Sequence, residues 1–172
     1  MAAHVSAAPN HQTGRTVPFK FRFDVAMQGR LGMEIQPKNM NDAEKEFAKR
    51  AIAAYKEVRP VVQFGDLYRL NSPYDTDDVT SLMYASEDKS KAVFYVYRTR
   101  KYCSIQNTPI IRLDGVDPNK NYKFTDLTPQ DPKRPNALNG KVISGSALKN
   151  NGIRVWLNDD YSSAVFKLEA VN

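Results

Sequence analysis

A change of hydrophobic period near residue 62 divides this sequence into two unlike parts. Before it, the small apolar run Val25-Ala26-Met27 predicts a buried strand, and a longer stretch with helical spacing follows. After it, short segments of period 2 alternate with turn residues, which is the pattern of all-β domains. We therefore predict two domains: residues 1–62, which hold one β/α unit, and residues 63–172, which form an antiparallel β-sandwich.

The helix of the β/α unit is expected to run from Asn41 to Arg59. Asn41 and Glu44 have the spacing of a capping box, and Pro60 is expected to stop the helix because the residue before a proline leaves the α region. The apolar stripe of this helix consists of Phe47, Ala48, Ala51, Ile52, Tyr55 and Val58. The first twenty-odd residues show no periodicity and are expected to be loop. One β/α unit cannot cover its own strand, so this part needs neighbouring strands.

About eight short strands are expected in residues 63–172. They are Leu67–Leu70, Ser81–Ala85, Lys91–Arg98, Ile110–Leu113, Tyr122–Leu127, Lys141–Ser144, Ile153–Leu157 and Ala164–Val171. The segment from Val93 to Tyr97 is apolar on both faces, which predicts a central strand. Because these strands can pair among themselves, we expect the sandwich to be the stable unit and a protease to cleave before about Gln63.

The charge of the chain does not indicate a nucleic-acid partner. The net charge is +6 over 172 residues, and the excess is spread over both parts. The densest basic stretch, Tyr97 to Tyr102, alternates cations with aromatics, but a charged edge strand has the same composition. No apolar run approaches the roughly 20 residues that span a bilayer, so no membrane partner is expected either. Met1 to Asn10 lacks the features of a signal peptide, and a cytoplasmic or periplasmic location stays open.

Residues suited to metal binding or nucleophilic catalysis are few. The two histidines, His4 and His11, have no nearby cysteine and no helical His-x-x-x-His spacing, so no metal site is expected. The single cysteine, Cys103, has no partner for a disulfide and no histidine placed to activate it. We expect it to be a small residue at a strand end. The sequence therefore predicts no metal and no cofactor.

The carboxylates and the tryptophan also have ordinary interpretations. The adjacent pairs Asp77-Asp78 and Asp159-Asp160 fall in predicted turns, where neither burial nor fixed geometry would make them catalytic. Trp156 and the tyrosines could form a platform on which a sugar stacks, although aromatics in strands mostly belong to the core. No catalytic residue is predicted from these patterns.

Several ordered motifs resemble those of family 36 glycoside hydrolases, the α-galactosidases. They are Ala3-His4-Val5-Ser6, Pro9-Asn10-His11-Gln12-Thr13-Gly14-Arg15, the run from Arg22 to Gly32, Tyr55 to Arg59, Val62 to Leu70, Ile111 to Pro118, Asn139-Gly140-Lys141 and Ser144-Gly145. The resemblance covers essentially the whole chain. It implies that residues 1–62 are the last part of a (β/α)₈ catalytic barrel, with Val25–Met27 as its final strand and Asn41–Arg59 as its final helix. Residues 63–172 would be the closing sandwich.

The resemblance also implies a retaining reaction with two aspartates, a nucleophile and an acid/base, both upstream of the Ala3–Ser6 motif. The Lys-Trp-Asp-like and Ser-Asp-(Asp/Asn)-Thr-Asp-like motifs that carry them do not occur here. No catalytic residue can therefore be assigned, and the chain is expected to be inactive alone. Ala2 stands where the family usually has glycine, after a methionine that is usually internal. Met1 is thus expected to be that internal methionine, used as a start.

The expected function is that of the C-terminal portion of an α-galactosidase acting on galacto-oligosaccharides such as melibiose and raffinose. The expected partner is the remainder of the parent chain. A cut barrel edge with the uncovered stripe of Phe47, Ile52, Tyr55 and Val58 would favour self-association. Two alternatives stay open: a non-catalytic carbohydrate-binding sandwich and a protein-interaction sandwich.

Overall fold

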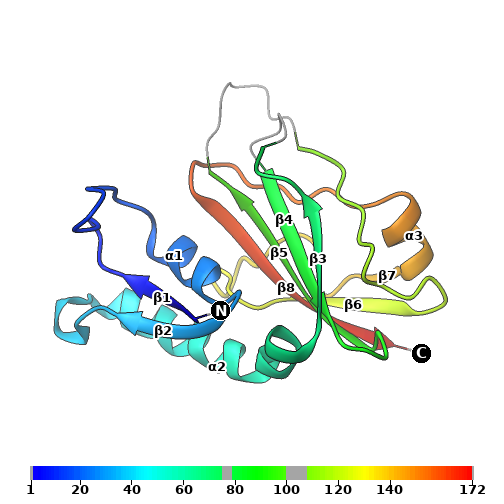
Figure 1. Ribbon diagram of the computed structural model, residues 1–172, viewed down its shortest axis with the longest axis horizontal. Helices are drawn as coiled ribbons and strands as arrows, with labels where there is room; N and C mark the ends of the chain where they lie inside the picture. Colours follow the sequence, from blue (N-terminus) through cyan, green and yellow to red (C-terminus); the bar gives the residue numbers. More distant parts are fainter. Residues whose placement is uncertain (1, 75–78, 100–107, 172) are drawn as a thin grey trace.

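The computed structural model describes residues 2–74, 79–99 and 108–171. These residues form three layers, and the middle layer is one antiparallel sheet (Figure 1). The first layer contains β1 (Ala2–Ser6), α1 (Phe19–Ala26), β2 (Arg30–Glu34), a short 3-10 helix (Pro37–Asn39) and α2 (Asp42–Phe64). The sheet contains β3 (Asp66–Asn71), β4 (Val79–Ala85), β5 (Lys91–Arg98), β6 (Asn121–Asp126), β7 (Val142–Ser144) and β8 (Ser162–Val171). The third layer is irregular except for α3 (Gly145–Asn150). The mainly β fold class is confirmed.

The first layer holds two β/α units, not the single one that the sequence predicts. β1 and β2 are parallel neighbours, with His4 opposite Gly32. β1 lies in the segment expected to be loop, and Val25–Met27, expected to be a strand, forms the end of α1 and the residue after it. A short apolar run does not distinguish a strand from a buried helical turn. Phe19 and Phe23 stand four residues apart on α1, and their rings meet edge to face. Such a contact between residues i and i+4 favours a helix over a strand in this segment.

α2 begins as predicted and ends later. The Asn41 side chain accepts a hydrogen bond from the Glu44 amide, and the Glu44 carboxylate accepts one from the Asn41 amide, which confirms the capping box. Pro60 does not stop the helix, which continues to Phe64. Pro60 lies on the exposed side, where one lost hydrogen bond is replaced by solvent. The following turn is retained because Val62 is buried against the sheet.

The six strands have the order β3-β4-β5-β8-β6-β7 and pair antiparallel. β5 and β8 lie in the middle, so the prediction of a central strand at Val93 to Tyr97 is correct. Two of the predicted strands, Ile110–Leu113 and Ile153–Leu157, are not regular strands in the described residues. They meet in one isolated antiparallel bridge between Ile111 and Ile153. Apolar and polar residues alternate in these segments because one side of each segment is buried against the sheet. The alternation does not reflect regular hydrogen bonding to a neighbouring strand.

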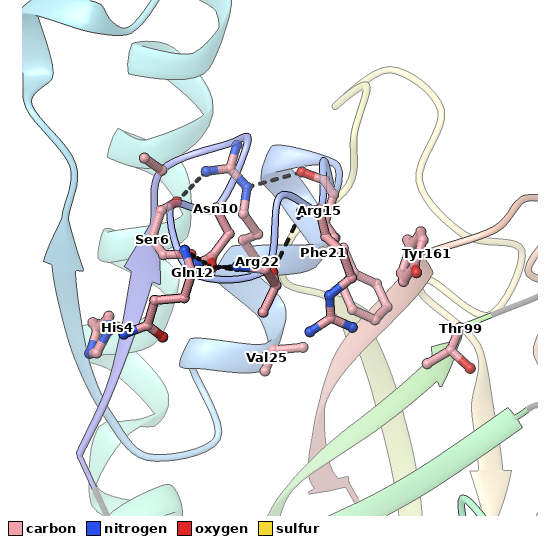
Figure 2. A pocket seen from close by; sticks show the side chains of 13 residues that line it. His4, Ser6, Asn10, Gln12, Arg15, Phe21, Arg22, Val25, Thr99 and Tyr161 are labelled. Carbon is pink, nitrogen blue, oxygen red and sulfur yellow. Dashed lines mark hydrogen bonds between the residues drawn. The ribbon is translucent and has the colours of Figure 1, made fainter.

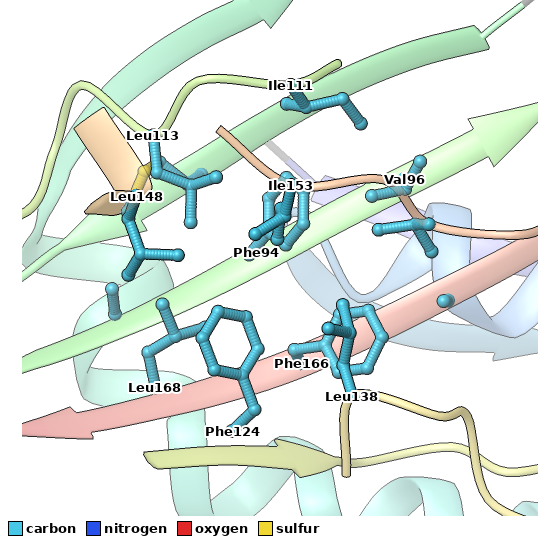
Figure 3. Packing of buried hydrophobic residues seen from close by; sticks show 14 of the residues in the cluster. Phe94, Val96, Ile111, Leu113, Phe124, Leu138, Leu148, Ile153, Phe166 and Leu168 are labelled. Atoms are coloured by element: carbon cyan, nitrogen blue, oxygen red, sulfur yellow. The ribbon is translucent and has the colours of Figure 1, made fainter. Parts of the chain in front are cut away.

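Residues 110–113 and 153–157 belong to the third layer, which takes the place of the second sheet of the expected sandwich. Their apolar side chains, together with Leu148 of α3, pack on Phe94, Phe166 and Phe124 of the sheet (Figure 3). α3 was not predicted; Ser144 caps it by accepting a hydrogen bond from the Ala147 amide at 3.2 Å. One face of the sheet is thus covered without a second regular sheet.

The other face of the sheet is covered by the first layer. Tyr55, Val58 and Val62 of α2 and Met27 share one apolar cluster with Val93, Tyr95, Tyr97 and Val165 of the sheet. Phe47 is buried in an adjoining cluster with Phe23 and Val5. The stripe that we expected to be uncovered is therefore buried, with only Ile52 half-exposed, and that expectation is wrong. α1 and the sheet cover α2.

Four tyrosine hydroxyls connect the sheet and α2 to the end of α1. They belong to Tyr97, Tyr95, Tyr84 and Tyr55, and they donate to the carbonyls of Asp24, Met27, Gln28 and Gly29 at 2.8, 3.0, 2.9 and 2.7 Å. The last carbonyls of a helix have no partner within the helix, so these hydroxyls act as a side-chain cap. We call these residues the tyrosine row. The row fixes the connection between α1 and β2 relative to the sheet.

Candidate functional site

The loop that follows β1, residues 7–17, is a polar segment held by several internal hydrogen bonds. It lies at the carboxyl ends of the two parallel strands, the edge at which α/β folds place their ligand sites. A cavity of about 420 Å³ opens beside it, and we call it the loop cavity (Figure 2). His4, Ser6, Asn10, Gln12, Arg15 and Arg22 contribute its polar groups.

Asn10 shapes the loop. Its side-chain oxygen accepts hydrogen bonds from the amides of Gln12 and Thr13, both at 3.0 Å. Its carbonyl accepts from the Gly14 amide at 2.8 Å, and its own amide donates to the Arg15 carbonyl at 2.9 Å. Gly14 has a φ of +67°, a conformation that glycine adopts without strain. The motif from Pro9 to Arg15 therefore encodes one fixed turn, which brings the Arg15 side chain to the cavity (Figure 2).

Arg22 fastens this loop to α1. Its guanidinium donates to the Val17 carbonyl at 3.0 Å and also to the Ser6 carbonyl, so it joins both ends of the loop. Burial lowers the pKa of Arg22, and the charge of Glu44 opposes that change. An arginine starts from so high a pKa that the group stays cationic at neutral pH. Arg22 thus supplies both a fixed positive charge and the closure of the loop.

His4 and Glu34 form a pair on the opposite face of the two strands from the helices. The His4 Nε2 atom lies 2.8 Å from the Glu34 Oε2 atom, and both side chains are well exposed. Alternation along β1 directs Val5 to the helices and His4 to the other face. Gly32 lies opposite His4 in the register, so no side chain separates the imidazole from the strand beside it. In a closed barrel this face would point to the interior.

The arrangement can bind and orient a polar ligand. It offers guanidinium and amide donors, the Gln12 side-chain oxygen and the His4 imidazole around one opening (Figure 2). Within residues 2–74, 79–99 and 108–171, no group of three or more histidine, cysteine or acidic side chains could hold a metal ion. In the same ranges, no helix is long and apolar enough to cross a membrane.

The residues singled out from the sequence do not gather at this site, apart from His4. His11 is exposed in the loop, and Asp159-Asp160 lie in a turn, as expected. Asp77-Asp78 and Cys103 lie outside the described residues. Tyr97 and Arg98, from the basic stretch, are buried, and its remaining described residue, Thr99, is exposed.

Sequence reasoning did not assign Asn10, Arg15, Arg22 or Glu34 to a site, although the first three lie in the quoted motifs. The signal that could have found them is an Asx turn and a glycine directly after a strand.

Two family profiles match the chain. The profile described as "Melibiase" matches residues 1–65, and the one described as "Glycosyl hydrolase family 36 C-terminal domain" matches residues 79–168. Among curated proteins, α-galactosidase AgaA of Geobacillus stearothermophilus is 35% identical over 174 residues, covering 99% of this chain and 22% of its own length. α-Galactosidase 2 of Hypocrea jecorina is 36% identical over 171 residues, covering 98% and 21%. The chain thus spans about a fifth of the length of these relatives.

Solved structures agree with the sequence matches. The galactosidase domain of the α-galactosidase–sucrose kinase AgaSK superposes with a TM-score of 0.86 at 32% identity, covering 99% of this chain and 22% of that one. A crystal structure of AgaA in complex with raffinose gives a TM-score of 0.85 at 34% identity with the same coverage. The α-galactosidase of Lactobacillus brevis gives 0.84 at 32%, covering 100% and 22%.

Proposed function

Because the chain belongs to glycoside hydrolase family 36, we propose that it is the C-terminal portion of an α-galactosidase. The parent enzyme would remove terminal α-D-galactosyl residues from galacto-oligosaccharides such as raffinose and melibiose, with retention of configuration. The remainder of the parent chain is the partner, and it supplies the nucleophile and the acid/base. This chain supplies structure around them.

The observation that carries this proposal is the pair of parallel β/α units with an ordered loop at the carboxyl ends of their strands. Two parallel strands cannot close a barrel, and their inner face carries polar side chains such as His4 and Glu34. Both features are those of a barrel segment whose neighbours come from elsewhere. The same site lies in the residues that match the Melibiase profile.

We propose that the loop of residues 7–17 forms part of the wall of the substrate cleft. In (β/α)₈ enzymes the catalytic groups stand at the carboxyl ends of the strands, so this loop would border the galactoside. Arg22 would keep the loop in place, and Asn10 would keep its turn. Neither would transfer a proton in the reaction.

We also propose the division of the chain into residues 1–62, from the barrel, and residues 63–172, the C-terminal β domain. The two family profiles, which end at residue 65 and begin at residue 79, support a boundary in this region. The change from parallel β/α units to an antiparallel sheet supports it as well. The shared apolar cluster between α2 and the sheet shows that the two parts are packed together and not joined by a free linker.

We expect self-association of the chain through its strand edges alone, because the apolar stripe on α2 is buried. The sheet of β1 and β2 has two strands, so each has one edge that no described strand covers. We propose that the isolated chain associates through these edges. Sedimentation equilibrium should show an average mass that rises with concentration. A monomeric mass at every concentration would contradict this proposal.

An activity assay of the isolated chain tests the proposed function. The purified chain should not hydrolyse an aryl α-galactoside above the rate of a buffer control, because the two catalytic carboxylates would belong to the rest of the enzyme. A matched control is the chain with Asp159 and Asp160 changed to Asn, which removes the described one of the two adjacent carboxylate pairs that the sequence analysis considered. Turnover that co-purifies with the wild-type chain and is lost in this variant would overturn the proposal.

A further inference from the structure

A second cavity of about 420 Å³ lies between the first turn of α1, the segment 126–136 and the segment 156–164. We call it the tryptophan cavity, because the only tryptophan of the chain, Trp156, lines it. We propose that the tryptophan cavity is a binding site for a neutral saccharide. The proposal does not depend on the α-galactosidase assignment, because it concerns binding by this chain alone.

The aromatic surface of the cavity is held in place and open to solvent. Trp156 is 55% exposed, whereas most aromatic side chains of the described strands are buried in the core. Tyr161 lies in the same cavity with a φ of +51°, a conformation that is uncommon for a residue with a side chain. Its ring meets that of Phe21 edge to face at 5.7 Å, which supports its position. Strained residues of this kind concentrate at ligand sites.

Polar side chains with unused hydrogen-bonding capacity face the same space. Among the described residues, none makes a hydrogen bond or ion pair with the side chains of Gln130, Arg134 or Asp159, and all three line the cavity. Together they offer amide and guanidinium donors and carboxylate and amide acceptors. Sugar hydroxyls both donate and accept, so a mixed set of this kind suits them.

The floor of the cavity is fixed by a polar network. The Asp126 carboxylate accepts hydrogen bonds from the amides of Asn136 and Thr128 at 2.9 and 3.3 Å. Lys20 is bound to Asp24 and donates to the Ser163 carbonyl at 2.9 Å. Lys20 also donates to the Thr128 hydroxyl at 3.3 Å, so it joins segment 126–136 to segment 156–164. A preorganised site loses little entropy when a ligand binds.

The charges of the cavity favour an uncharged ligand. Lys20 and Arg134 are cationic, whereas Asp126, Asp159 and Asp160 are anionic. The carboxylates of Asp159 and Asp160 oppose a phosphate or another anion, and Arg134 opposes a cationic ligand, whereas Lys20 is already paired with Asp24. A pyranose is neutral, places its apolar face on an indole ring and directs its hydroxyls at the polar rim. A saccharide is therefore the ligand class that fits both the aromatic and the polar groups.

The fluorescence of Trp156 allows a direct test, because no other tryptophan contributes. The wild-type chain should be titrated with raffinose, maltotriose and xylotriose, and with inorganic phosphate as the anionic probe. We expect a saturable change in emission, and protection from iodide quenching, with at least one trisaccharide and none with phosphate. No saturable change with any of the three sugars up to the solubility limit would overturn the proposal, as would an equal response to phosphate.

Two variants separate this site from unspecific contact with the indole. Arg134→Ala keeps the fluorescent probe and should raise the dissociation constant at least about fivefold, because it removes a charged donor. Trp156→Ala, followed by calorimetry, should abolish binding. Tyr74→Ala is the matched control, since Tyr74 is 95% exposed and lies outside the cavity, and it should bind as the wild type does. Unchanged affinity in Arg134→Ala, or equal loss in Tyr74→Ala, would contradict the assignment.

Discussion

At the scale of single residues, the tyrosine row does more than fill the core. Tyr95 and Tyr97 lie on the central strand β5, and their hydroxyls cap the end of α1. The sequence indicates that these rings are buried, because the strand is apolar on both faces. It does not reveal their acceptors, which stand 68 and 73 residues earlier in the chain. Partners so distant in sequence follow only from the packing of α1 on the sheet.

Removing one hydroxyl of the row should cost measurable stability. Tyr97→Phe leaves the Asp24 carbonyl without its donor in a buried place, and we expect the free energy of unfolding to fall by about 1–2 kcal/mol. Tyr74→Phe is the control, because its ring is exposed and the change should stay within about 0.5 kcal/mol. Urea unfolding followed by circular dichroism measures both. Equal stability of the two variants would show that the hydroxyl bond contributes nothing.

The same burial makes stability sensitive to alkaline pH. Burial raises the pKa of both Tyr95 and Tyr97 well above the usual tyrosine value. The unfolded chain loses these protons near pH 10 while the folded chain keeps them, so stability is fully present below pH 10 and is lost as the pH rises further. Each tyrosine should lower the free energy of unfolding by about 1.4 kcal/mol per pH unit in that range.

Unfolding curves at several pH values above neutrality, with tyrosinate absorbance as a second signal, measure this effect. In Tyr97→Phe, the decrease of the free energy of unfolding with pH above pH 10 should be smaller by the contribution of one tyrosine, about 1.4 kcal/mol per pH unit. A slope that is the same in the variant and the wild type would show that Tyr97 ionises normally in the folded chain.

At the scale of elements, the errors of the sequence prediction have one physical origin. Val25–Met27 belongs to a helical turn, and Ile153–Leu157 to an extended segment without a ladder, although both have the composition of buried strands. A short apolar run predicts that a segment is buried, but it does not predict whether the backbone is helical or extended. The neighbouring elements determine that conformation. The capping box at Asn41 and the central strand at β5 were predicted correctly, because a cap and a long apolar run are local signals.

The stripe on α2 gives an element-scale prediction that reverses our first expectation. Replacing Phe47 with Lys would have raised solubility had the stripe been uncovered. Phe47 is instead buried between Phe19 and Phe23, with ring centroids at 6.0 and 5.8 Å. We expect Phe47→Lys to lower the free energy of unfolding by about 3–5 kcal/mol, because it removes a buried ring and buries a charge.

Lys49→Ala on the exposed side of α2 is the control for this variant and should change stability by no more than about 0.5 kcal/mol. Thermal unfolding and size-exclusion chromatography measure the two together. A Phe47→Lys chain that stays folded and becomes more soluble would mean that the first layer is not packed as described.

At the scale of the whole molecule, the sheet is covered on one face by the first layer and on the other by the irregular layer that contains α3. The sequence predicts the two parts and their boundary, but the cluster that joins Tyr55, Val58 and Val62 to the sheet is not visible in either part alone. The Lys167–Glu57 ion pair at 2.5 Å also crosses from the sheet to α2. The loop cavity likewise depends on contacts between segments far apart, which explains why only its turn residues carry a signal in the sequence.

This shared cluster predicts a single unfolding transition for the described molecule. A fragment containing residues 63–172 alone would expose the face that bears Val93, Tyr95 and Val165, and we expect it to aggregate or to melt at a lower temperature than the full chain. The earlier expectation of an independently stable sandwich is revised accordingly. Calorimetry of both proteins measures the difference. A fragment as stable as the full chain would restore the earlier view.

A chimera with AgaA of Geobacillus stearothermophilus tests the central claim most directly. The segment of AgaA that this chain matches is replaced by this chain, and hydrolysis of an aryl α-galactoside is measured. AgaA without that segment is the negative control. If this chain closes the barrel and supports the cleft, the chimera should be active and the truncated protein inactive. A chimera that is folded and monodisperse but no more active than the truncated protein would contradict the account.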